Sequence, residues 1–165
     1  MFNEYSLRPI QILLKMEFTK EDEIVFEKFF LLKEKRQFKK ALKVLDVLEV
    51  KYKDSSVIHG LYGSSYYELN DFKNSAKHFS KVIAIKPGSE LASLALYVSL
   101  VEIGKDRKAL KELFRYTETF EPKLYIDTIK KLMEENMHGI GFKIDRKKIE
   151  NLYKKWITPE IQSAL

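Results

Sequence analysis

Apolar residues recur at intervals of three and four along this chain, with charged and polar residues between them. Ile149, Leu152 and Tyr153 illustrate the pattern, because they share one face of a helix while lysines occupy the other face. Turn-forming pairs such as Asn70-Asp71 and Gly104-Lys105 interrupt it. The pattern predicts helices over residues 21–34, 38–51, 56–69, 72–85, 89–103 and 106–118.

A repeat of 34 residues underlies these helices. Positions 34 apart carry side chains of similar size, and the aligned sets are Leu32, Tyr66 and Leu100; Ala41, Ser75 and Ala109; and Leu45, Phe79 and Leu113. A period of this length with a helical pattern means that each unit consists of two short helices.

The middle unit resembles the tetratricopeptide repeat (TPR) family, whose pattern is W-x2-L-G-x2-Y, then A-x3-F, then P. The corresponding residues here are His59, Tyr62, Gly63, Tyr66, Ser75, Phe79 and Pro87. His59 and Tyr62 depart from the pattern, and the other five fit. The following unit matches at Leu96, Leu100, Gly104, Ala109 and Leu113, with Pro122 one residue late. The first unit, from Asp22, is more degenerate.

The resemblance implies an all-α fold, a right-handed superhelical solenoid of antiparallel helix hairpins. It divides the chain into an N-terminal apolar segment (1–21), a degenerate first repeat (22–55), the best-matching second repeat (56–89), a third repeat (90–122) and C-terminal capping helices (123–165). Solenoids need such terminal helices to close their last hydrophobic surface.

Small and aromatic residues mark the predicted contacts between helices. Gly63 and Ser75 fall where two helices approach closely, and aromatic rings fill the space beside them. The predicted repeat-packing residues are Gly63, Tyr66, Ser75, Phe79, Pro87, Ala41 and Ala109. Thr19 with Asp22 resembles a capping box, and Ser89 is a suitable N-cap before Glu90.

Two further helices are predicted after the repeats. Pro122 can open a helix at its first turn, and this helix would run to about Met137. A break at 138–141 separates it from the last helix, which Asp145 would start. Residues 1–18 form a short segment rich in apolar residues.

Composition excludes several classes of protein. The 165 residues contain no cysteine, which excludes disulfide scaffolds and thiolate metal sites. The net charge is +6, with basic excess concentrated in 28–53 and 143–155. Basic and acidic residues alternate there, so we expect solvated helix faces and no specific nucleic-acid binding. No apolar stretch is long enough for a membrane span or a signal peptide, so we expect a cytoplasmic protein with no membrane partner.

Catalytic motifs are absent from the sequence. It contains no Walker phosphate loop, GxGxxG fingerprint or GxSxG elbow, and the predicted protein is not an enzyme and takes no cofactor. The histidines lack metal-ligand spacing, so we expect no metal site. His59 is expected in the core or at its rim, and His78 on the solvent-facing side of its helix.

The TPR resemblance implies a concave face lined by helix A of each repeat. Its partner-binding groove is predicted to consist of Phe26, Phe30, Tyr67, Leu94, Val98 and Val101. The positions that bind a C-terminal carboxylate in some family members do not match here, which disfavours that mode of binding. Because soluble proteins rarely expose such an apolar patch, we expect residues 1–18 or a second subunit of a homodimer to cover it. Alternatively, residues 1–18 cap the outer surface of the first repeat.

The sequence supports three hypotheses about function. The first is a non-enzymatic adaptor, scaffold or chaperone that binds an apolar or helical polypeptide segment in the groove. The second is a bacterial toxin-immunity protein or secretion chaperone. The third is a weak nucleic-acid binder acting through its basic surface. Fold likeness alone does not choose among them.

Overall fold

The structure of this protein is a computed structural model that describes residues 18–137 and 146–158. Its described elements are α2 (Lys20–Glu34), α3 (Phe38–Lys51), α4 (Ser56–Glu68), α5 (Phe72–Ile85), α6 (Glu90–Glu102), α7 (Asp106–Thr119), α8 (Ile126–Met137) and α9 (Arg146–Trp156). The described residues form no strand. The predicted all-α fold is therefore confirmed.

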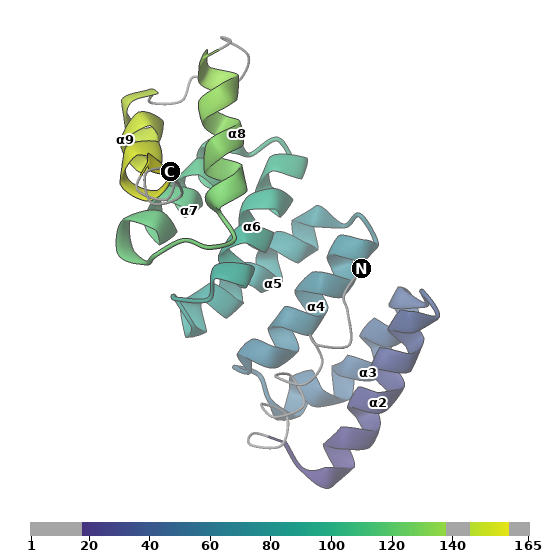
Figure 1. Cartoon of the computed structure of the whole chain (residues 1–165). Helices are drawn as coiled ribbons and strands as arrows, with labels where there is room; N and C mark the ends of the chain where they lie inside the picture. The colour runs from purple at the N-terminus through teal and green to yellow at the C-terminus, as the bar shows by residue number, and fades with distance from the viewer. Residues whose placement is uncertain (1–17, 138–145, 159–165) are drawn as a thin grey trace.

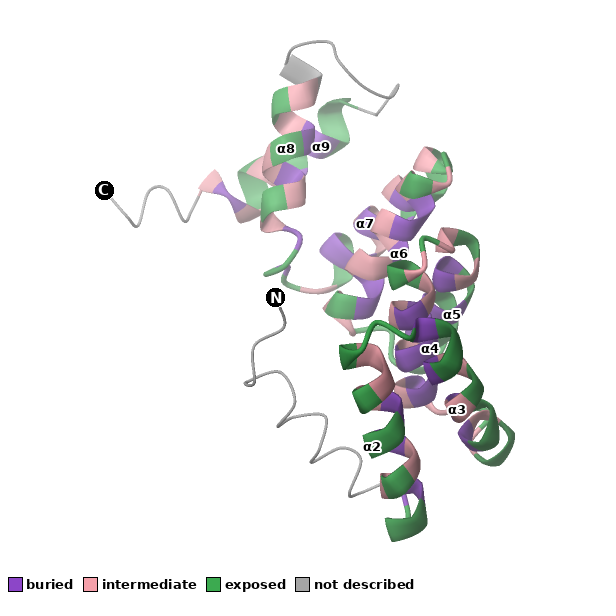
Figure 2. Cartoon of the chain, turned by 90° about the vertical axis from the view of Figure 1, so that its right-hand side faces the viewer, coloured by how far each residue is buried: buried purple, intermediate pink, exposed green. Residues whose placement is uncertain are grey.

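Each helix from α2 to α6 packs on the next one along the chain, and α8 packs on α9 (Figure 1). Buried positions lie where helices face one another, and exposed positions lie on the outer sides (Figure 2). Three clusters of buried residues form the core, in chain order from Phe18 to Tyr62, from Ala76 to Ala109 and from Leu113 to Ile157. This arrangement of consecutive hairpins is compatible with helical repeats.

The turns inside the hairpins repeat every 34 residues. Arg36, Asn70 and Gly104 all have positive φ, at 54°, 57° and 67°. In each turn the next residue donates its backbone N–H to a carbonyl five residues earlier, at 2.8–2.9 Å. This is the Schellman arrangement, which satisfies carbonyls that a helix end would otherwise leave unpaired. The same backbone geometry therefore recurs although only Gly104 is a glycine.

The helix bounds agree closely with the sequence pattern. The helices predicted over 38–51 and 72–85 have those bounds. Three of the other repeat helices differ by one residue at one end, and the helix predicted over 89–103 is one residue shorter at each end. Both predicted caps are present: Thr19 and Asp22 form a capping box, and the Ser89 hydroxyl accepts from the Ala92 backbone N–H. These agreements arise from local signals that each helix carries in its own sequence.

The prediction that Pro122 opens a helix is wrong, because α8 begins at Ile126. A carboxylate oxygen of Glu90, on α6, accepts the backbone N–H groups of Lys123, Leu124 and Tyr125 at 2.7, 2.7 and 3.1 Å. A side chain distant in sequence therefore holds the segment before α8 and satisfies three backbone donors there. The predicted break at 138–141 and the start at Asp145 lie outside the described residues.

The residues predicted to pack the repeats together differ in their burial. Ala41, Ser75 and Ala109 are fully buried, and Phe79 is buried, while Tyr66 is half-buried. A Cβ on Gly63 would lie 3.0 Å from two ring carbons of Phe79, so α4 and α5 approach as closely as expected. Pro87 is exposed, just beyond the end of α5.

The described part of the chain begins at Phe18. Its ring contacts Phe26 and Tyr52 edge-on, with centroids 4.9 and 4.7 Å apart. Residues 1–17, and with them the hypothesis that they fill the groove, lie outside the described residues. Within the described ranges, no helix combines the length and apolarity needed to cross a membrane.

Asp22 links the start of α2 to the end of α3. Its carboxylate accepts hydrogen bonds from the Thr19 backbone and hydroxyl at 2.9 and 2.8 Å, and from the Lys51 ammonium at 2.9 Å. The Tyr52 hydroxyl donates to the same carboxylate. Although burial alone would raise the pKa of Asp22, the hydrogen bonds from Tyr52, Thr19 and Lys51 outweigh it and hold that pKa well below its ordinary value.

The two glycines of α4 provide a matched test of helix packing. A Cβ on Gly60 would meet no atom within 4 Å, so we expect Gly60→Ala to stabilise the helix by roughly 0.5–1 kcal/mol. Gly63→Leu should instead overpack the contact with Phe79 and cost about 1–3 kcal/mol or more. Urea unfolding measures both changes. Equal stability of the two variants would show that Phe79 does not hold α5 against α4.

The lowered pKa of Asp22 predicts a specific acid sensitivity. A carboxyl whose folded pKa is lowered stabilises the fold above its ordinary pKa of 3.8 and loses that contribution as the pH falls below it. We expect Asp22→Asn to be less stable at neutral pH and to lose less stability on acidification than the wild type. Glu27→Gln, at an exposed position of the same helix, is the control. Parallel acid unfolding curves for wild type and Asp22→Asn would contradict the prediction.

Candidate binding cleft

A cleft of about 500 Å³ lies between α5 and α7, and residues of α6 also line it. Four residues of α5 and four of α7 form its walls: Lys73, Ala76, Lys77 and Ser80, and Lys108, Lys111, Glu112 and Arg115. The spacing of three and four within each set places its members on one face of their helix. We call this hollow the α5–α7 cleft.

The floor of the α5–α7 cleft is apolar. Leu96 and Leu100 of α6 contribute to it, together with Ala76 and Ile103. Leu96 and Leu100 are buried and belong to the second core cluster. None of the lining residues is aromatic. The floor is therefore an extension of the hydrophobic core that reaches the surface between two helices.

The rim of the cleft is strongly basic. Its lining contains five lysines, Lys73, Lys77, Lys105, Lys108 and Lys111, in addition to Arg115, and Glu112 is its one acidic residue. Among the ion pairs within the described ranges, only the one made by Arg115 involves a basic residue of the cleft. The side chains on this rim thus present positive charge to an approaching ligand.

A buried polar network fixes one end of the cleft. Arg115 donates to both oxygens of the Glu112 carboxylate at 2.7 and 2.8 Å, and to the Pro87 carbonyl at 3.1 Å. The Ser93 hydroxyl donates to the same carboxylate and lies 2.9 Å from the Tyr125 hydroxyl. Burial raises the pKa of Tyr125, so its hydroxyl keeps its proton at neutral pH. The network joins α6, α7 and the segment before α8.

The six residues predicted to line a groove are divided among different parts of the core. Phe26 is 2% exposed in the first cluster, and Phe30 packs against the same cluster. Val101 packs on the second cluster and Leu94 on the third, while Val98 is half-buried. Of the six, only Tyr67 is exposed, and its ring contacts Phe72 edge-on at 5.2 Å. The α5–α7 cleft contains none of them.

The expectation that His78 faces solvent is wrong, since its side chain is buried between α4 and α5 with the rings of Tyr62 and Tyr66 stacked against it. The reason is its position on α5, three residues after Ser75 and four before Val82, on the buried face. His59 is buried, as expected. His138 lies outside the described residues.

Sequence reasoning missed the α5–α7 cleft because it searched for contiguous basic stretches. The two stretches it identified, 28–53 and 143–155, contribute no residue to the cleft. The signal that could have found it is helical: Lys73 and Lys77 share one face of α5, and Lys108 and Lys111 share one face of α7. The packing of α5 and α7 on α6 brings these two faces to one surface.

No model of a known protein family matches this chain, and neither does any curated protein. The recurrence of turns and buried positions every 34 residues is compatible with helical repeats and does not assign the chain to a family.

The network of Glu112 and Arg115 predicts an asymmetric response to substitution. The Glu112 side chain is 9% exposed and that of Arg115 is 33% exposed. Removing Arg115 therefore leaves a buried carboxylate without its cation, whereas removing the charge of Glu112 leaves a guanidinium that can reach water. We expect Arg115→Met to cost about 3 kcal/mol and Glu112→Gln about 1.5 kcal/mol. Urea unfolding, with Arg107→Met at an exposed site of α7 as control, measures both costs, and the reverse order would refute the assignment.

Proposed function

We propose that this chain is a non-enzymatic, TPR-like adaptor that binds an acidic polypeptide segment in the α5–α7 cleft. The observation that carries the proposal is the combination of an apolar floor and a basic rim in one hollow. A segment with apolar residues on one face and carboxylates beside them would complement both features.

The TPR-like part of the proposal rests on the recurrence at 34 residues. The positive-φ turns, the start residues of α3, α5 and α7, and the fully buried Ala41, Ser75 and Ala109 all repeat at that interval. On this proposal the hairpins form a right-handed solenoid, and α8 and α9 cap its C-terminal end. A cytoplasmic setting belongs to the same proposal.

The cleft is a better candidate surface than the groove predicted from the family resemblance. The groove residues are spread over the core, since Phe26 belongs to the first cluster and Phe30 packs against it, while Val101 packs on the second and Leu94 on the third. The cleft instead presents lysines around an apolar floor. Hydrophobic burial would supply affinity, and the surrounding charges would favour acidic segments and speed association.

Nucleic acid is the second candidate ligand, because the same lysines could neutralise phosphates. Two features favour polypeptide. The lining has no aromatic side chain on which a base could stack, and its floor is apolar rather than polar. Binding to nucleic acid would be non-specific and strongly dependent on salt.

The test uses the full chain and three labelled probes. The first is an amphipathic peptide with leucine on one helical face and glutamate on the other. The second replaces each leucine by serine, and the third is a single-stranded oligonucleotide. We expect the first peptide to bind more tightly than the other two at physiological ionic strength, because only it complements both the floor and the rim.

Charge reversal locates the site. We expect Lys73→Glu, Lys77→Glu and Lys108→Glu together to weaken binding of the amphipathic peptide by about tenfold or more, as about 0.5 kcal/mol per rim charge would give. The control carries the same charge change at Lys39, Lys40 and Lys43, which are exposed on α3 and outside the cleft. Equal loss in both variants, or tighter binding of the oligonucleotide, would refute the proposal.

A further inference from the structure

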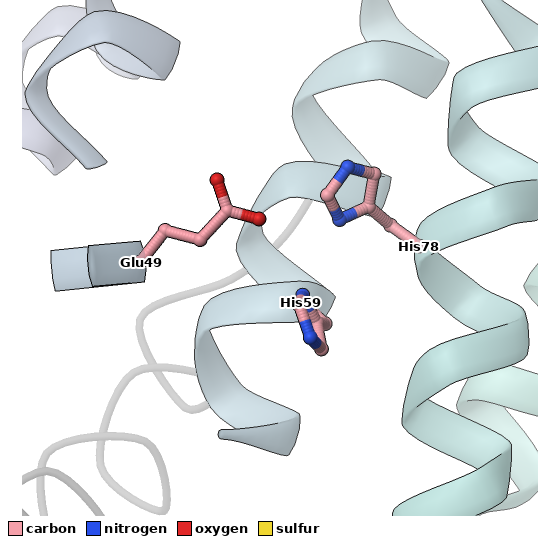
Figure 3. Close-up of side chains that lie close together, drawn as sticks. All are labelled: Glu49, His59 and His78. Atoms are coloured by element: carbon pink, nitrogen blue, oxygen red, sulfur yellow. The ribbon is translucent and has the colours of Figure 1, made fainter. Parts of the chain in front are cut away.

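Three side chains that can bind a metal ion converge between α3, α4 and α5 (Figure 3). They are Glu49 of α3, His59 of α4 and His78 of α5. One potential ligand atom from each residue lies within 4.8 Å of those from the other two. The cluster shares no residue with the α5–α7 cleft, so a ligand bound there is independent of the proposed function.

Both imidazoles are buried, and one nitrogen of each ring lacks a hydrogen-bond partner within the described part of the chain. His59 is 2% exposed and His78 is 7% exposed. The Nδ1 atom of each ring is buried and has no hydrogen-bond partner among the residues that the structure describes. Buried polar atoms are nearly always paired, and an unpaired one needs an explanation. A metal ion bound between the rings would pair with such atoms.

The protonation states suit a cation. Burial lowers the pKa of His78 to about 4, and the neighbouring His59, Lys81 and Lys77 act in the same direction. Burial and Lys81 also lower the pKa of His59, against opposing effects of the Lys53 backbone, Glu49 and Asp54. Both rings are therefore neutral at neutral pH, which is the form that binds metals.

Aromatic contacts hold the second histidine in place. The ring of Tyr62 stacks on His78 with centroids 4.8 Å apart, and that of Tyr66 stacks at 5.5 Å. The Tyr62 hydroxyl in turn donates to Asp46 of α3 at 2.7 Å. All three candidate ligands stand on helices, which fix side chains more firmly than loops do.

We propose that Glu49, His59 and His78 bind one divalent transition-metal ion, with zinc as the best fit. Two imidazole nitrogens and one carboxylate oxygen suit Zn²⁺, whereas Mg²⁺ and Ca²⁺ prefer ligands that are all oxygen. Ligand atoms in a tetrahedral zinc site lie about 3.3 Å apart, given bonds of about 2.0–2.1 Å. The candidate ligand atoms lie within 4.8 Å of one another, so the side chains would have to move closer together to bind the ion.

The charged groups around the cluster favour a bound ion only with Glu49 present. Lys77 and Lys81 on α5 place positive charge near the rings, and Glu49 and Asp54 oppose it. Removing the Glu49 carboxylate would therefore remove a ligand. It would also leave the positive charge of Lys77 and Lys81 less compensated. The bound ion would fasten α3 to the α4–α5 hairpin, so it would stabilise the folded chain by linkage.

The test titrates zinc into untagged, chelator-treated full-length protein by calorimetry and measures the thermal midpoint. We expect one Zn²⁺ per chain and a higher midpoint with zinc than without it. Cobalt gives an independent readout, because Co²⁺ bound by two imidazoles, a carboxylate and a water molecule in tetrahedral geometry absorbs visible light far more strongly than aqueous Co²⁺.

Glu49→Gln is the decisive variant, since Glu49 is only half-buried and its loss leaves the aromatic packing intact. We expect it to weaken zinc binding at least tenfold and to change the cobalt spectrum, and His59→Gln to do the same. Glu34→Gln, at an exposed position, is the control. Failure of the wild type to bind zinc, or binding by Glu49→Gln as tight as by the wild type, would overturn the proposal.

Discussion

The contact between helices within each hairpin depends on small residues at the crossing points. Gly63 lets α4 approach α5 until two ring carbons of Phe79 lie 3.0 Å from where a Cβ would stand, and the fully buried Ser75 and Ala109 occupy corresponding positions of successive hairpins. Close packing leaves no room for an added methyl group at such points. The close approach of the helices sets the orientation of every outward-facing side chain, including those that form the α5–α7 cleft.

Helix α5 shows how one element serves two surfaces. Its face toward α4 carries His78 and Phe79, which are buried, and this face contributes His78 to the cluster with Glu49. Its opposite face carries Lys73 and Lys77 and forms one wall of the cleft. Because the two faces point in different directions, a ligand on one need not disturb the other. The buried face determines both, since it fixes the rotation of the helix about its own axis.

Three carboxylates accept hydrogen bonds that join one segment of the chain to another. The Asp22 carboxylate accepts hydrogen bonds from Thr19, Lys51 and Tyr52. The Glu90 carboxylate accepts hydrogen bonds from three backbone N–H groups ahead of α8. Glu112 receives Arg115 and Ser93 between α6 and α7. Each of these groups is paired by donors from another segment, as buried or half-buried charge requires. In a chain with many lysines, the acidic residues thus determine which segments come together.

The sequence by itself determined the 34-residue period, the bounds of the repeat helices and the caps at Thr19 and Ser89. The helix bounds and caps depend on neighbours within one or two turns, so local propensity is sufficient to specify them. The tertiary structure decided the start of α8 at Ile126 and the convergence of Lys73 and Lys108 on one cleft. Each of these depends on a contact between residues far apart in the chain. The rotation of a helix against its neighbours places such residues together, and no local pattern records that rotation.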